Sequence, residues 1–148
     1  MRTIDAIRRS AVGIRPDQTL REAAEIMEQA GVGSLVVVDD GRLVGLVTDR
    51  DLVRRGLAKG LDPAARIDGL MSAPVTTISA DADLHDAFAI FRTHAVRRLP
   101  VVREETVVGV LTIDDLLVDV AADLADLARP VTAEAIFGQR DPSVPATT

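Results

Sequence analysis

Two short stretches of the chain carry the same arrangement of side chains that could do chemistry. Residues 45–52 read GLVTDRDL and residues 109–116 read GVLTIDDL, so a threonine precedes an aspartate by three positions in each. At a helix start, the side chain of such a threonine accepts a hydrogen bond from the backbone N–H of the aspartate, and the aspartate side chain accepts one from the backbone N–H of the threonine. The same groups could serve a ligand, because free N–H groups suit a phosphate and an acceptor-only carboxylate suits ribose hydroxyls. The motif alone leaves both interpretations open.

An internal duplication explains why the motif occurs twice. Residues 15–52 align with residues 79–116 without a gap, at an offset of 64, and 13 of the 38 positions are identical. The apolar pattern keeps its register throughout, so we interpret the alignment as a true repeat. The identical pairs are Asp17/Asp81, Leu20/Leu84, Ala23/Ala87, Ile26/Ile90, Val32/Val96, Leu35/Leu99, Val37/Val101, Val38/Val102, Val44/Val108, Gly45/Gly109, Thr48/Thr112, Asp51/Asp115 and Leu52/Leu116.

Each repeat is predicted to fold as strand, helix, strand, strand and helix. Thr19 to Glu22 read as a capping box, Gly31 is placed to end that helix, and Asp83 is placed to start the equivalent one. Asp40-Gly41 indicates a tight hairpin between two apolar runs. The predicted strands are 12–14, 35–38 and 43–47 in the first repeat, and 75–78, 99–102 and 107–111 in the second, with the last helices beginning at Thr48 and Thr112.

The expected fold class is α+β, with two small repeats packed by their sheets about an approximate two-fold axis. One repeat of about 50 residues would leave an apolar sheet face uncovered, and two copies can cover each other. We expect a first repeat at 1–60, a second at 61–128 and a C-terminal tail at 129–148. Residues 57–73 connect the repeats, with a short helix around 67–71, and Val131–Phe137 is predicted to be a short docked segment before a loose end.

Composition restricts the classes of function. The chain has 148 residues, a formal net charge of −6 and no cysteine, so thiolate catalysis, disulfides and Cys-ligated metals are excluded. A negative chain disfavours a nucleic-acid backbone as the partner. With neither a membrane-span pattern nor a signal-peptide pattern, we expect a cytoplasmic protein. His85 and His94 do not share a helix face, so we expect surface residues and no metal site.

The repeat with both motifs resembles the CBS-domain pair, also called a Bateman module, over about residues 3–128. The second repeat also carries VRRLPVV at 96–102, which is typical of that family, whereas Val36 of the first stands where proline is commoner. The resemblance implies binding of AMP, ADP, ATP, S-adenosylmethionine or NAD, dimerisation into a flat disc, and regulation of a partner protein. It implies no cofactor beyond such a regulatory nucleotide.

The resemblance also implies two clefts, each built from both repeats. The first would combine Thr112, Asp114, Asp115, Arg97 and Arg98 with Val12, Val32, Gly33 and Ser34. The second would combine Thr48, Asp51, Thr76 and Val96, with Arg50 as a further candidate. The first is expected to bind more tightly, because paired arginines suit a phosphate.

We therefore expect a stand-alone regulatory module that senses adenosine-containing nucleotides and is not an enzyme. Two alternatives remain open. One is a dimeric interaction module with empty clefts, in which the motif residues only cap helices. The other is a hydrolase using the adjacent carboxylates Asp39-Asp40 or Asp114-Asp115, although nothing in the sequence resembles an assembled nucleophile and base.

Overall fold

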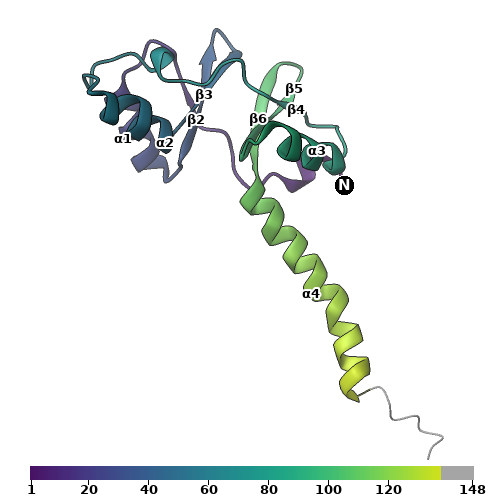
Figure 1. The fold of residues 1–148 in the computed structure, drawn as a ribbon. Helices are drawn as coiled ribbons and strands as arrows, with labels where there is room; N and C mark the ends of the chain where they lie inside the picture. The colour runs from purple at the N-terminus through teal and green to yellow at the C-terminus, as the bar shows by residue number, and fades with distance from the viewer. Residues whose placement is uncertain (138–148) are drawn as a thin grey trace, which may run out of the picture. The chain divides into compact units, whose positions relative to one another are not determined.

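The computed structural model describes the backbone of residues 1–137 and the side chains of residues 1–130. The chain forms two compact units, the first comprising Met1–Thr112 and the second beginning at Ile113. Both sheets lie in the first unit, and helix α4, Ile113–Phe137, belongs to the second (Figure 1).

Each repeat has the predicted order of elements. The first comprises η1 (Thr3–Ala6), β1 (Gly13–Ile14), α1 (Leu20–Ala30), β2 (Ser34–Asp39), β3 (Arg42–Thr48) and α2 (Asp49–Asp51), which continues as a π-helical turn, η2 (Leu52–Gly56), and a 3-10 turn, η3 (Leu57–Lys59). The second comprises η4 (Ile67–Gly69), β4 (Ile78–Ser79), α3 (Leu84–His94), β5 (Arg98–Arg103) and β6 (Thr106–Thr112), followed by α4.

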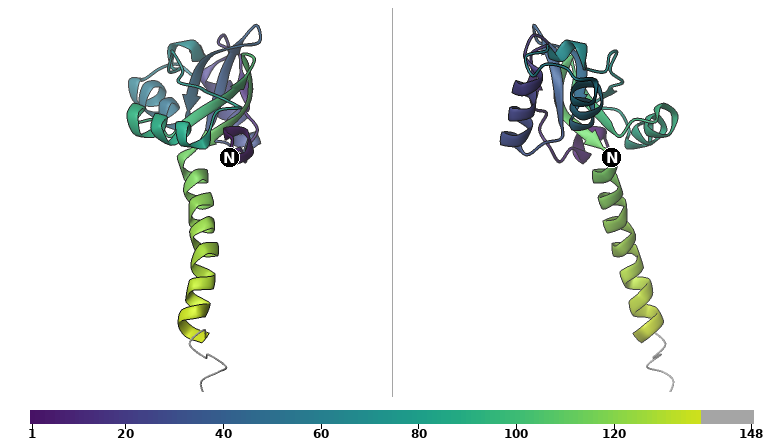
Figure 2. Two further views of the ribbon diagram at one scale, coloured as in Figure 1. Left: turned by 90° about the vertical axis from the view of Figure 1, so that its right-hand side faces the viewer. Right: turned by 60° about the vertical axis from the view of Figure 1, so that its left-hand side comes forward.

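The two sheets share one topology. Their strand orders are β1-β2-β3 and β4-β5-β6, each with one parallel and one antiparallel pair. The registers are equivalent, since Ser34 faces Thr48 in one sheet and Arg98 faces Thr112 in the other. β3 contacts β6, and the strands lie between α1 and α3, an arrangement that Figure 1 and the right-hand view of Figure 2 show. The α+β fold with packed sheets is therefore confirmed.

Local signals in the sequence account for the element boundaries. Thr19 Oγ1 accepts from the N–H of Glu22 at 3.1 Å, and Glu22 Oε1 accepts from the N–H of Thr19 at 3.2 Å, which completes the predicted capping box. Hydrogen bonds from Gln18 and then Thr19 lower the pKa of Glu22. Gly31 ends α1 with a φ of 65°. Asp83 caps α3 by accepting from the N–H of His85 at 2.8 Å.

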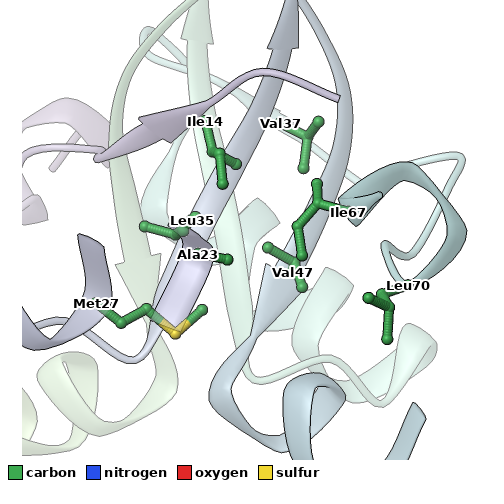
Figure 3. Close-up of a cluster of buried hydrophobic side chains, with 8 residues drawn as sticks. All are labelled: Ile14, Ala23, Met27, Leu35, Val37, Val47, Ile67 and Leu70. Carbon is green, nitrogen blue, oxygen red and sulfur yellow. The ribbon is translucent and has the colours of Figure 1, made fainter. Parts of the chain in front are cut away.

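The core of the first repeat is aliphatic, as the scarcity of aromatic residues requires. Ile14, Leu35, Val37 and Val47 from the sheet meet Ala23 and Met27 from α1 (Figure 3). Ile67 and Leu70 complete this cluster, although they come from the segment that leads into the second repeat. The first repeat therefore has no complete core without that segment.

The repeats exchange their lead-in segments. The segment before β1 binds the second repeat, since the N–H of Ile4 donates to the carbonyl of Ala80 at 3.1 Å and the N–H of Leu84 donates to the carbonyl of Met1 at 2.9 Å. The segment before β4 binds the first repeat through paired backbone bonds between Leu46 and Ser72, at 3.1 and 2.8 Å. The exchange ties the two repeats into one unit.

The motif glycines are where these segments cross the sheets. A Cβ on Gly45 would lie 2.3 Å from Met71 Sδ, and one on Gly109 would lie 2.5 Å from Ile7 Cγ2. Ile7 and Met71 are themselves 64 positions apart, so the duplication extends into the lead-in segments. The glycine of each motif is therefore explained by close packing.

Helix α4 crosses the predicted boundary after Ala128. α4 continues to Phe137 with Pro130 inside it, although proline removes one helical hydrogen bond. Helix-favouring residues lie on both sides of Pro130, with Leu127 and Ala128 before it and Ala133 and Ala135 after it. Residues 131–137 are thus helical. The docking predicted for Ile136 and Phe137 concerns side chains that lie outside the described residues, and residues 138–148 lie outside them altogether. Within the described chain, no helix combines the length and the apolar character that a membrane crossing needs.

Gly109→Ala should lower the free energy of unfolding by about 1–3 kcal/mol, because the new methyl group overpacks the crossing with Ile7. Gly69→Ala is the matched control, since a Cβ there meets nothing within 4 Å. Urea denaturation of both variants checks this. Equal stabilities of the two variants would mean that the crossing does not require the glycine.

Candidate functional site

One hollow in the first unit brings together residues from both repeats. Its volume is about 260 Å³. β3 and the turn after it supply one wall, the segment between Ser72 and Thr76 supplies another, and the chain entering β5 supplies the third. We call it the arginine pocket. Its lining residues are Leu46, Thr48, Arg50, Ser72, Pro74, Val75, Thr76, Val96, Arg97 and Arg98.

The chemistry of the arginine pocket is divided between cationic, hydroxyl and apolar groups. Arg50, Arg97 and Arg98 supply three guanidinium groups, and none of the described lining residues carries a carboxylate. Guanidinium groups bind phosphate oxygens with paired N–H bonds and retain their charge at every physiological pH. The pocket is therefore suited to an anionic ligand with an apolar portion.

The lead-in segment of the second repeat builds one wall of this pocket. Ser72 is held on β3 by its backbone bonds to Leu46, and the chain then continues directly into Pro74, Val75 and Thr76. The crossing over Gly45 therefore also fixes the segment that carries Thr76, which lines the pocket together with Thr48. From the sequence, Thr76 was expected only through the family resemblance. Leu46, Ser72, Pro74 and Val75 were not predicted, because nothing local indicates that residues 72–76 lie beside β3.

The first motif forms a reciprocal helix cap at the edge of the pocket. The N–H of Asp51 donates to Thr48 Oγ1 at 3.1 Å, and the N–H of Thr48 donates to Asp51 Oδ2 at 2.9 Å. Asp51 Oδ1 also lies 3.8 Å from Arg55 Nε. Thr48 lines the pocket, whereas Asp51 supports it from behind. The capping role that the sequence allowed is thus present in the first repeat.

The paired arginines lie beside the first motif. Arg97 and Arg98 were expected in one cleft with Thr112, but both line the pocket that contains Thr48, Thr76 and Val96. Arg98 also faces Thr112 across the β5–β6 register. A Cβ on Gly33 would lie 3.1 Å from Arg98 Nη2 and 3.0 Å from Asp49 Oδ2, so this guanidinium extends to the first repeat. The glycine at position 33 leaves the space that Arg98 needs.

The remaining residues that were predicted to bind a ligand are divided between positions at or near the starts of β1 and β2 in the first repeat and the end of β6 with the start of α4 in the second. Val12 accepts a backbone bond from Val36 at 2.9 Å, and Ser34 faces Thr48 at the start of β2. Val32 and Gly33 are half-buried just before that strand. Thr112 ends β6 in the first unit, and Asp114 and Asp115 lie in the first turn of α4 in the second unit. Their use as a second cleft stays a prediction.

A second hollow lies near the hairpin ends. Its volume is about 460 Å³, and it is lined by Arg42, Leu43, Val44, Pro74, Val75, Thr77, Val102 and Glu105. Its one arginine is accompanied by a carboxylate. The arginine pocket is therefore the better match to an anion.

The CBS domain family model matches the chain twice, at residues 3–58 and 66–122. The chain belongs to the CBS domain family. Its two CBS domains form a tandem, or Bateman, module, and they account for both copies of the motif.

Curated relatives match most of this CBS pair. CBS domain-containing protein YhcV of Bacillus subtilis is 35% identical over 115 residues, which cover 78% of this chain and 82% of the relative. Hypoxic response protein 1 of Mycobacterium tuberculosis is 39% identical over 101 residues, which cover 67% of this chain and 71% of the relative.

Solved CBS structures have the same fold. A CBS domain protein from Pyrobaculum aerophilum, complexed with AMP, is 29% identical with a TM-score of 0.72, and the match covers 82% of this chain and 99% of that one. Hypoxic response protein I, with two coordinated zinc ions, is 34% identical with a TM-score of 0.70, and the match covers 79% and 97%. In the part of our chain that the structure describes, no group of three or more metal-ligating side chains gathers.

Asp51→Ala should lower the free energy of unfolding by about 1 kcal/mol, because the N–H of Thr48 loses Asp51 Oδ2 as its acceptor, while the backbone N–H of residue 51 can still donate to Thr48 Oγ1. Asp49→Ala is the control, since that exposed carboxylate accepts from the adjacent N–H of Arg50 and its loss should matter clearly less. Chemical denaturation measures both variants. A larger loss from Asp49→Ala would contradict the capping role of Asp51.

Proposed function

We propose that this CBS pair is a regulatory module that binds an adenosine nucleotide in the arginine pocket and signals through a partner protein. The observation that carries the proposal is the convergence of Arg50, Arg97 and Arg98 on one pocket with hydroxyl and aliphatic walls. The AMP complex of the P. aerophilum CBS protein supports the ligand class.

The pocket favours AMP, ADP or ATP among the adenosine-containing candidates. Three guanidinium groups attract phosphates, and they oppose the positive sulfonium of S-adenosylmethionine. A volume of about 260 Å³ lies just below the usual 300–1,000 Å³ of small-molecule sites, so one nucleotide is a better fit than the dinucleotide NAD.

Each kind of lining residue has a distinct role in the proposed complex. Arg97 and Arg98 hold phosphate oxygens through charge-assisted hydrogen bonds. Thr48 and Thr76 bond to the sugar or the first phosphate, while Leu46, Val75 and Val96 pack on the adenine ring. Asp51 acts through Thr48, whose position it fixes.

Signalling requires that the output pass through a surface of the module. Binding of a nucleotide to residues of both CBS domains would tighten the contact between their sheets, because the ligand bridges β3 and the chain entering β5. A partner that distinguishes the tightened state from the empty one would then sense the nucleotide. Among the residues whose side chains the structure describes, no nucleophile and base are assembled, which favours regulation over catalysis.

An interaction module with unoccupied clefts is the alternative, and one observation favours it. Thr48 and Asp51 already satisfy each other as a helix cap, so their presence does not require a ligand. This alternative predicts that adenine nucleotides leave the melting temperature unchanged, whereas nucleotide at 100 times its Kd should add about 2.7 kcal/mol of stability.

Arg98→Ala should weaken ATP binding at least tenfold and leave adenosine binding nearly unchanged, because one charged hydrogen bond contributes about 1.5–3 kcal/mol. Arg92→Ala on the exposed surface of α3 is the charge-matched control. Calorimetric titration with ATP and adenosine measures both. Equal losses for the two ligands would show that Arg98 does not hold a phosphate.

We also expect the full chain to be a homodimer at micromolar concentration. Ile26 of α1 and Phe88 and Ile90 of α3 are only half-buried in one copy, and a second copy can cover them. Multi-angle light scattering checks the mass, and a monomer at that concentration would contradict the expectation.

A further inference from the structure

Helix α4 carries an exposed apolar stripe with the spacing of a coiled-coil seam. Leu117, Val120, Leu124 and Leu127 follow one another at intervals of three, four and three residues, and they are 62%, 40%, 60% and 70% exposed. Alternating intervals of three and four place all four on one face, where they correspond to the a and d positions of a heptad. We call these four residues the α4 seam.

Polar residues of α4 lie away from the seam. By helical geometry Asp119 and Asp126 project on the opposite side, and Asp126 lies 3.9 Å from Arg129 as an exposed ion pair. Asp123 flanks the seam on one edge, while Ala121 and Ala128 flank it on the other. The helix is therefore amphipathic, with one aliphatic face and one solvated face.

Two of the four seam residues have no aliphatic counterpart in the first repeat. At the offset of 64, Val120 and Leu124 replace Gly56 and Gly60. Gly60 ends the equivalent helix with a φ of 70°, and a Cβ on Gly56 would lie 3.1 Å from Leu20. The second repeat therefore lacks both glycines, and its last helix continues as the long helix α4. At the two equivalent positions it has the exposed aliphatic side chains of Val120 and Leu124.

We propose that the α4 seam pairs, parallel and in register, with the α4 seam of a second copy of this chain. Every seam residue is aliphatic and of similar size, so each layer fits its own counterpart across a two-fold axis. Small Ala121 and Ala128 allow the two helices to approach closely. The carboxylates of Asp119 and Asp126 stay in water, so the seam carries no charge that would select a foreign basic helix.

Asp123 decides the orientation of the pair. In a parallel pair its neighbour across the interface is Ala128 of the second copy, and no like charges meet. In the antiparallel pair that keeps all four layers, Asp123 would face its own counterpart at the centre of the seam. Two carboxylates that face each other across the interface repel and destabilise the pair, so the parallel arrangement is favoured.

Disulfide trapping tests the arrangement directly, because the natural chain has no cysteine. Leu117→Cys and Leu124→Cys each place a thiol on the seam. Val118→Cys is the matched control, since Val118 is 63% exposed against 62% for Leu117, but lies off the seam. Under mild oxidation of the full chain, both seam variants should form disulfide-linked dimers at least tenfold faster than the control.

Two outcomes of this trapping would overturn the proposal. One is an equal rate for seam and control variants. The other is faster cross-linking in a mixture of Leu117→Cys with Leu127→Cys than in either alone, which would show antiparallel helices. All these positions are exposed, so the variants should keep the fold, and circular dichroism of the reduced proteins checks this.

A second measurement needs no cross-link. Glutamate at both Leu124 and Leu127 should weaken self-association at least tenfold in sedimentation equilibrium, whereas Val118→Glu should leave it unchanged. Unchanged association in the double variant would exclude the α4 seam from the interface. Nucleotide binding in the arginine pocket involves none of these residues, so the proposal and the proposed function can fail independently.

Discussion

The structure of the CBS pair depends on one steric constraint, the crossing of each lead-in segment over the motif glycine of the other repeat. Met71 lies on Gly45 and Ile7 lies on Gly109, at positions where any side chain on the strand would collide. Because of these crossings, Ile67 and Leu70 fill the first core and the N-terminal segment binds the second sheet. Neither repeat is complete alone, so the duplicated unit folds as a pair.

The same crossing connects the fold to the proposed binding site. Ser72 is fixed on β3 by backbone hydrogen bonds, and together with Pro74, Val75 and Thr76 it forms a wall of the arginine pocket. Gly45, Thr48 and Asp51 of the motif thus act at successive steps: the glycine admits the crossing segment, the threonine lines the pocket, and the aspartate holds the threonine. A motif that is explained locally by packing and capping can therefore still position a ligand site.

Local signals predicted the fold well, because each was sufficient by itself. Thr19 with Glu22, the left-handed Gly31 and the Asp40-Gly41 turn fixed boundaries that the structure confirms. The second hairpin turns through Glu104 and Glu105 at φ values of 49° and 68°. It therefore forms the same turn as the first hairpin, although Glu105 stands where the first has Gly41. Helix α4 continues through Pro130 to Phe137, although a tail was expected to begin after Ala128. The pocket was harder to predict, because the packing of Ser72–Thr76 on β3 is a long-range contact that no local pattern encodes.

An NMR titration of the labelled full chain with AMP tests whether an adenosine nucleotide binds in the arginine pocket. If it does, the backbone amides of Thr48, Arg50, Thr76 and residues 96–98 should shift together and saturate with one Kd. Shifts confined to the other hollow, around Arg42, Thr77 and Glu105, or no saturable shifts at millimolar AMP, would rule out binding in the arginine pocket.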